Sequence, residues 1–147
     1  MRGMSPLFFE TLNPEQLQTL ELLSGINVGM LVGETALALQ LGHRKSYGLD
    51  FVTQQFSPKM VQKIKVAVGS CQIQQLLLSD TQYTAFAEGV KITLFEDSST
   101  LLHPLVVHEH VTLVSYEDIF STKLFILGKR ATWRDYCDIA VCLNQKK

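Results

Sequence analysis

The sequence predicts a single mixed α/β (α+β) domain spanning residues 1–147. Short apolar segments of β type alternate with helical patterns that begin at capping residues, and no repeat, linker or low-complexity segment interrupts them. Hydrophobic residues make up 46% and charged residues 18% of the chain, which is enough apolar material for one core. We therefore expect a mixed β-sheet flanked by helices, with a helical pair at the C-terminal end.

The first third of the chain predicts two helices and two strands. Asn13 can cap a helix that starts at Pro14, Gln16 can complete a capping box, and Gly25 can end the helix. Residues 27–32 have the apolar character of a buried strand. A short apolar helix is then expected over residues 35–41, followed by a second strand over residues 49–53.

The middle of the chain predicts one helix and a β-hairpin. Ser57 and Pro58 begin a helix that runs to about residue 68. The segments 72–78, 83–87 and 90–95 have strand character, and Glu88-Gly89 forms the turn between the last two. Residues 96–104 are polar and predict a loop, and residues 105–113 contain a further β-rich piece.

Two capping boxes predict the C-terminal helical pair. Ser115 to Asp118 begins one helix, which Gly128 ends, and Thr132 to Asp135 begins the other. The bulky apolar residues of the last helix predict its buried face, which comprises Trp133, Tyr136, Ile139, Ala140 and Leu143.

Composition and charge argue against several classes of protein. The net charge of −1 does not favour general nucleic-acid binding, although cations cluster at Arg44-Lys45 and over residues 123–134. No apolar run approaches the ~18–20 residues that span a bilayer, and the N-terminus carries no secretion signal, so no membrane partner is expected. The three cysteines form no CxxC motif and indicate reduced thiols in a cytoplasmic protein. His108 and His110 are a weak zinc signal, more typical of surface histidines.

Two groups of motifs carry a resemblance to a known family. The first contains Gly33-Glu34-Thr35, an Ala-Leu helix, His43-Arg44-Lys45-Ser46 and Gly48-Leu49-Asp50-Phe51. The second contains Glu117-Asp118-Ile119, Lys123-Leu124, Arg130 and the run 134–138. In this order, over roughly residues 28–143, the chain resembles the AbiEii/AbiGii-type nucleotidyltransferases, toxin components of bacterial abortive-infection and toxin–antitoxin systems.

The resemblance implies the polymerase-β nucleotidyltransferase fold, built around a nucleoside triphosphate and Mg²⁺. It further implies transfer of a nucleotide to an RNA such as a tRNA end, or to a protein acceptor, with a cognate antitoxin as partner. Backbone N–H groups at a glycine turn and helix start suit phosphates, and a strand acid suits Mg²⁺. The implied site residues are Gly33, Thr35, Arg44, Ser46 and Arg130 for the nucleotide and its phosphates, Asp50 for metal and catalysis, Lys123 for phosphate charge, and Asp135 or Asp138 to complete the site.

Three positions depart from the family pattern. Gly48 replaces the first acid of the Asp-x-Asp pair, and Thr93 occupies the strand position expected to supply a third acid. Losing one carboxylate of a metal clamp raises the barrier by ~3–5 kcal/mol or more. Glu34 replaces a turn glycine and adds bulk and negative charge, although it is also a candidate for the missing metal ligand. The alternative to an active enzyme is therefore an inactive module that binds nucleotide, RNA or a partner protein.

Structural explanations exist for the same residues. Gly33 and Thr35 also fit a plain strand-to-helix turn, and Asp50 also fits a surface pair with Arg44. Asp135 also fits a capping box, and Asp138 also fits an i,i+4 pair with Arg134. The functional interpretation requires residues distant in the chain to line one cleft, namely Thr35, Asp50, Lys123 and Asp135 or Asp138.

Overall fold

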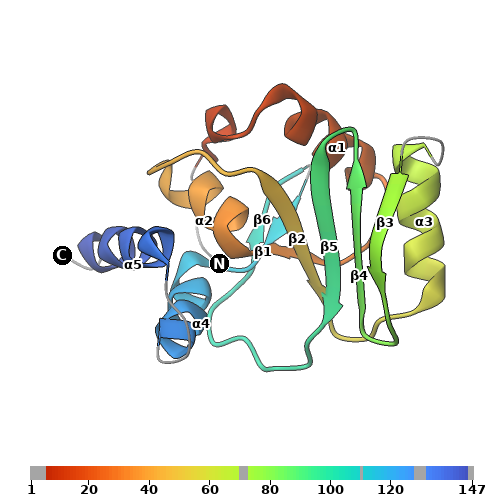
Figure 1. The fold of residues 1–147 in the computed structure, drawn as a ribbon. Coiled ribbons are helices and arrows are strands. Elements are labelled where there is room, and N and C mark those ends of the chain that lie inside the picture. The colour runs from red at the N-terminus through yellow and green to blue at the C-terminus, as the bar shows by residue number, and fades with distance from the viewer. Residues whose placement is uncertain (1–5, 70–72, 110, 128–131, 146–147) are drawn as a thin grey trace.

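The computed structural model describes residues 6–69, 73–109, 111–127 and 132–145, which form the mixed α/β domain that the sequence predicts (Figure 1). Its sheet has the strand order β3-β4-β5-β2-β1-β7-β6. The helices are α1 (Pro14–Ser24), α2 (Gly33–Leu41), α3 (Pro58–Val68), α4 (Tyr116–Leu127) and α5 (Trp133–Asn144), preceded by a 3-10 turn at Phe9–Thr11. The strands are β1 (Met30–Val32), β2 (Gly48–Thr53), β3 (Ile73–Leu78), β4 (Gln82–Ala87), β5 (Val90–Glu96), β6 (Val106–Val107) and β7 (Thr112–Leu113).

Strand β2 lies at the centre of the sheet and is paired on both sides. It runs parallel to β5 and antiparallel to β1, so the sheet is mixed. Asp50, in the middle of β2, is paired with Val32 at the end of β1 on one side and with Thr93 on the other. The strand therefore holds an acidic side chain directly beside the start of α2, because α2 begins at the residue after Val32.

The two faces of the sheet differ in character. Alternate residues of β2 and β5, such as Leu49 and Ile92, are buried in the core with Leu20 of α1 and Ile64 of α3. The intervening residues point to the other face, which α1 and α3 do not cover. Figure 1 shows α2, α4 and α5 gathered at the β2 side of the sheet and α3 beside β3. Helix α2 contacts β1, β2, α4 and α5, and so joins the sheet to the C-terminal helices.

Most predicted elements are confirmed, with one strand shorter than expected. The capping boxes of α1 and α5 are formed as predicted, and the β4–β5 turn carries positive φ angles at Glu88 and Gly89. Strand β1 begins only at Met30. At Gly29, where φ is +135°, a Cβ atom would lie 2.3 Å from the backbone oxygen of Val52. The positive φ angle lies outside the strand region, so the strand starts only after Gly29, and the close approach to Val52 requires glycine there.

The predicted buried face of the last helix is wrong. Trp133 is 80% exposed, Tyr136, Ala140 and Leu143 are also exposed, and of the predicted set only Ile139 is buried. Helix α5 instead turns Asp138 and Cys142 inward with Ile139. The physical reason is that cations from other elements surround the Asp138 carboxylate. Among the described residues, no helix combines the length and hydrophobicity required to cross a bilayer.

One carbonyl oxygen at the start of β2 accepts two hydrogen bonds, one from α2 and one from α1. The Thr35 hydroxyl donates to the backbone oxygen of Gly48, and Gln16 Nε2 donates to the same oxygen at 3.1 Å. Both side chains are buried. Residue 48 therefore has a backbone role in positioning α1, α2 and β2, and this role does not depend on its side chain.

Replacing Thr35 with Val is expected to lower the free energy of unfolding by about 1 kcal/mol, because one buried hydrogen bond is lost while Gln16 still satisfies the acceptor. Urea denaturation measures the change. The matched control is Thr122→Val, since among the described residues the exposed Thr122 hydroxyl bonds only to the Asp118 carbonyl of its own helix. Equal stability losses in the two variants would contradict the role given to Thr35.

Candidate functional site

Asp50 and the first residue of α2 lie in direct contact. Gly33 has a φ of +73°, and a Cβ atom built there would lie 2.9 Å from Asp50 Oδ2. Only glycine permits this approach, because a side chain would collide with the carboxylate. Within the described residues, no side chain caps α2, whose preceding residue Val32 is extended. The backbone N–H groups of the first turn therefore face the region of Asp50 without a protein cap.

The carboxyl group of Asp50 is in an unfavourable environment for a negative charge. Burial raises the pKa of Asp50 above its ordinary value, and the nearby negative charge of Glu34 raises it further. A hydrogen bond from the Thr93 hydroxyl and the positive charge of Lys91 act in the opposite direction but are smaller. Asp50 therefore lies where additional positive charge would stabilise its ionised form.

The structure brings the three strand positions considered for metal binding to one face of the sheet. Gly48 and Asp50 are alternate residues of β2, and Asp50 is paired with Thr93 in β5. Only Asp50 has a carboxylate. The acid of β5, Glu96, does not replace the missing ones, because it is paired with Thr53 at the other end of β2 and accepts a hydrogen bond from the Phe56 backbone N–H.

A buried ionic network lies beside this face. Asp138 of α5 is fully buried and accepts hydrogen bonds from His43 Nε2 at 2.6 Å and from Arg44 Nε and Nη2 at 2.9 Å each. Lys123 Nζ of α4 lies 3.0 Å from Asp138 Oδ2. Burial alone raises the pKa of Asp138, but the hydrogen bonds from these three residues outweigh it and hold the pKa well below the usual range.

The network extends from Asp138 to the start of α2. Arg44 Nη2 also donates to Glu34 Oε2 at 3.1 Å, and Arg134 Nη1 lies 3.9 Å from the same oxygen. The i,i+4 ion pair of Arg134 with Asp138 that the sequence suggested is therefore not formed, and Arg134 lies near Glu34 instead. The suggested ion pair of Arg44 with Asp50 is not formed either, because the Arg44 guanidinium donates to Asp138 and Glu34.

Lys123 is held in the same way at the other end of the network. Its Nζ atom donates to Asp135 Oδ1 at 3.0 Å, in addition to its contact with Asp138. Burial lowers the pKa of Lys123, but hydrogen bonds to the two carboxylates reverse this and raise the pKa overall. Asp135 also completes the capping box with Thr132, so both explanations considered for Asp135 are present together.

The remaining predicted residues differ in accessibility. The Thr35 hydroxyl points to the Gly48 carbonyl, and Ser46 is buried with an Oγ atom that finds no hydrogen-bond partner among the described residues. Arg130 and His110 lie outside the described residues. Thr35 and Asp50 thus lie at the start of α2, while Lys123, Asp135 and Asp138 lie at the α4–α5 junction, and Glu34 and Arg44 connect the two groups.

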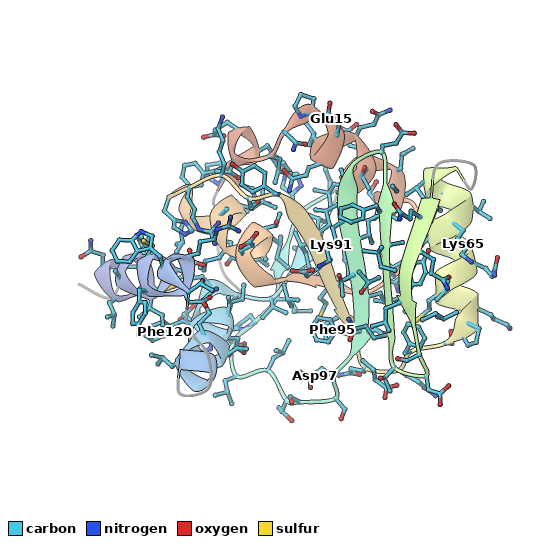
Figure 2. The ribbon with its side chains drawn as sticks, viewed as in Figure 1. Glu15, Lys65, Lys91, Phe95, Asp97 and Phe120 are labelled. Carbon is cyan, nitrogen blue, oxygen red and sulfur yellow. The ribbon has the colours of Figure 1, made fainter. Side chains whose placement is uncertain are left out.

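Two participants were not selected from the sequence. His43 contacts Asp138, and Lys91 lies opposite Gly48 on β5 (Figure 2). The alternation of β5 could have identified Lys91, because it is two residues from Thr93 and so shares its face. The contact of His43 with Asp138 carries no local sequence signal, since 95 positions separate the two residues.

Comparison with solved structures finds several chains with a similar fold. The chain superposes on JHP933 from Helicobacter pylori with a TM-score of 0.67 at 20% identity, covering 87% of this chain and 66% of that one. A second H. pylori structure, a candidate nucleotidyltransferase, gives a TM-score of 0.60 at 21% identity, covering 82% and 61% of the two chains. ANT(2″)-Ia in complex with adenylyl-2″-tobramycin gives 0.65 at 12% identity, covering 95% and 91%.

The chain has a nucleotidyltransferase fold. It spans less than two thirds of the length of the two H. pylori chains, 61% and 66%. No protein-family model matches the sequence, and a search of curated proteins finds no match. The likeness to solved structures, at these identities, concerns the fold alone.

Asp138→Asn is expected to destabilise the protein by about 3–5 kcal/mol, because it leaves buried cations of the network without their shared anion. Chemical denaturation measures the change. Asp80→Asn, in the exposed turn between β3 and β4, is the matched control and is expected to have little effect. A similar loss in both variants would contradict the structural importance of the network.

The network also predicts loss of stability in acid. Because the pKa of Asp138 is lower in the folded state than its ordinary value of about 3.9, its contribution is complete above that value and is lost as the pH falls below it. The difference in free energy of unfolding between the wild type and Asp138→Asn is therefore expected to narrow as the pH falls from about 5 through the ordinary pKa range of Asp. The comparison extends down to the lowest pH at which both proteins remain folded. Denaturation midpoints of both proteins over this range test it, and a constant difference contradicts it.

Proposed function

We propose that this chain is a nucleotide-binding member of the AbiEii-like nucleotidyltransferases that has lost nucleotide transfer. It binds a nucleoside triphosphate beside Asp50, at the start of α2, and serves as a binding component of a bacterial toxin–antitoxin or phage-defence system. The observation that carries the proposal concerns three positions on the open face of the sheet, Gly48, Asp50 and Thr93. Of these three, Asp50 alone has a carboxylate.

Nucleotide binding is supported by the backbone at the start of α2. Helix N-termini attract phosphates, since their first N–H groups lack helical partners and carry the positive end of the helix dipole. Here Gly33 brings that backbone against β2, and the first turn lacks a side-chain cap among the described residues. The similar structure ANT(2″)-Ia was solved in complex with adenylyl-2″-tobramycin, which is consistent with a nucleotide-handling fold.

The residues of this chain do not fit a two-carboxylate Mg²⁺ clamp. Mg²⁺ requires oxygen ligands in near-octahedral geometry, and catalytic sites in phosphoryl transfer fix it with carboxylates. Glu34 is the other acid near Asp50, but Arg44 holds its carboxylate at 3.1 Å. In the part of the chain that the structure describes, no group of three or more His, Cys, Asp or Glu side chains is arranged to hold a metal ion. These residues therefore do not supply the ligand set of a catalytic Mg²⁺.

The family resemblance implies an acceptor that receives the nucleotide, but in this proposal the acceptor is only bound. An RNA such as a tRNA end, a protein substrate or a cognate antitoxin is then a ligand rather than a substrate. Arg44, Lys123 and Arg134 lie at the helical side of the site and carry the charge that would face such a ligand, although each is near a carboxylate. Identification of a small neighbouring gene of antitoxin type would support the defence setting.

The proposal predicts that the wild type transfers no label from any of the four nucleoside triphosphates to RNA or protein in the presence of Mg²⁺. The double variant Gly48→Asp, Thr93→Asp is expected to gain transfer, because it restores carboxylates beside Asp50. A Cβ atom at residue 48 meets only the Lys91 carbonyl at 3.4 Å, which is ordinary contact, so an acid fits there. Radiolabel incorporation measures both results.

The matched control is Gly25→Asp, which adds an acid where no atom lies within 4 Å of the new Cβ. It is expected to leave transfer absent. Transfer by the wild type that disappears in Asp50→Ala would contradict the proposal and establish an active enzyme in which Glu34 or another group replaces the missing acid. Absence of nucleotide binding under all conditions would also contradict it.

A further inference from the structure

Lys91 occupies a distinctive position on the open face of the sheet. It is paired with Gly48 in the parallel β2–β5 register, so the lysine lies beside the strand position that lacks its acid. Lys91 shares this face with Thr93 and Asp50, because alternate strand residues point the same way and Thr93 bonds to Asp50. Figure 2 labels Lys91 over the sheet near β2, above Phe95 of the same strand.

Lys91 is an exposed cation of this region, whereas Arg44 and Lys123 are already engaged with carboxylates. Arg44 and Lys123 are half-buried and each contacts two carboxylates. Lys91 is exposed and, among the described residues, forms no ion pair within 4.0 Å. Its charge nevertheless reaches Asp50, where it opposes in part the rise in pKa that burial and Glu34 cause. An ammonium group here can therefore approach a ligand on the open face without first breaking a protein salt bridge.

We propose that the Lys91 ammonium replaces the divalent cation of the site, and that the chain binds nucleoside triphosphates without Mg²⁺. The inference rests on the proposed function and adds how the charge of the ligand is balanced. A triphosphate placed at the start of α2 lies next to the negatively charged Asp50, and this repulsion requires a cation nearby. A metal ion fulfils this role when two acids hold it; with Gly48 in place of one acid, the neighbouring lysine supplies the positive charge.

Asp50 then has a role opposite to that of a metal ligand. In a metal-dependent site, removing the carboxylate weakens nucleotide binding, because the metal is lost with it. In the site proposed here, the carboxylate only repels the phosphates and competes for Lys91. Asp50→Asn is therefore expected to strengthen binding of metal-free nucleotide, and this reversal of sign separates the two mechanisms.

Titration calorimetry of ATP binding to the full chain, in EDTA and in excess Mg²⁺, tests the inference. The dissociation constants under the two conditions are expected to agree within about threefold, and Lys91→Ala is expected to weaken binding about tenfold in EDTA. Lys91→Arg is expected to remain within about threefold of the wild type, since it retains the charge. Asp50→Asn is expected to strengthen binding several-fold in EDTA.

The matched control is Lys63→Ala, which removes one exposed positive charge from α3, a helix that packs on the opposite face of the sheet. It is expected to change ATP binding less than about twofold, the scale of a distant, screened charge. Circular dichroism and thermal denaturation confirm that each variant is folded. Lys91 is exposed, so its replacement leaves the core intact.

The outcomes separate this inference from the proposed function. Binding that requires Mg²⁺ and is unaffected by Lys91→Ala overturns the inference but leaves a nucleotide-binding protein. Equal losses in Lys91→Ala and Lys63→Ala also overturn it, because they indicate general charge attraction. Absence of ATP binding in every condition overturns the proposed function itself.

Discussion

The arrangement of the site depends on one buried carboxylate. Asp138 has no exposed surface and receives His43, Arg44 and Lys123, which come from the loop after α2 and from α4. A buried charge is tolerated only when it is paired and hydrogen-bonded, so these elements are constrained to meet at one point. The same contacts fix the orientation of α5 and leave its aromatic residues Trp133 and Tyr136 outside.

The network also determines which positive charges remain for a ligand. A guanidinium or ammonium group that already contacts two carboxylates has much of its charge balanced and fewer N–H donors left for a phosphate. Arg44 and Lys123, which the family resemblance assigns to phosphate, are in this state. The charge balance of the site is thus shifted toward its open face, where Asp50 and Lys91 lie on neighbouring strands. In the binding mode proposed above, recognition of a ligand at this face depends on these two residues and on the backbone of α2.

The sequence was sufficient for local structure and for the order of the elements, but less so for contacts between distant elements. Capping boxes and hairpin turns depend on residues three or four positions apart, so α1, α5 and the β4–β5 turn could be predicted. The orientation of α5 could not, because bulky apolar residues suggested one face while the cations around Asp138 selected another. The family resemblance indicated Thr93 as the position of a third acid, but the pairing of Thr93 with Asp50 and of Lys91 with Gly48 is given only by the strand register of the structure.

Residue 48 contributes to the fold through its backbone and not through a side chain. The part of this residue that holds the structure together is its carbonyl oxygen, which accepts hydrogen bonds from Thr35 and Gln16. Every amino acid supplies that oxygen, so replacing an acid by glycine removes a candidate metal ligand without removing either bond. The conformation of Gly48 is not one that demands glycine, since a Cβ atom there makes only ordinary contact. The hydrogen bonds that position α1, α2 and β2 therefore use the backbone oxygen of residue 48, whereas a metal ligand at this position would come from its side chain. A change of side chain can remove such a ligand and leave both hydrogen bonds in place.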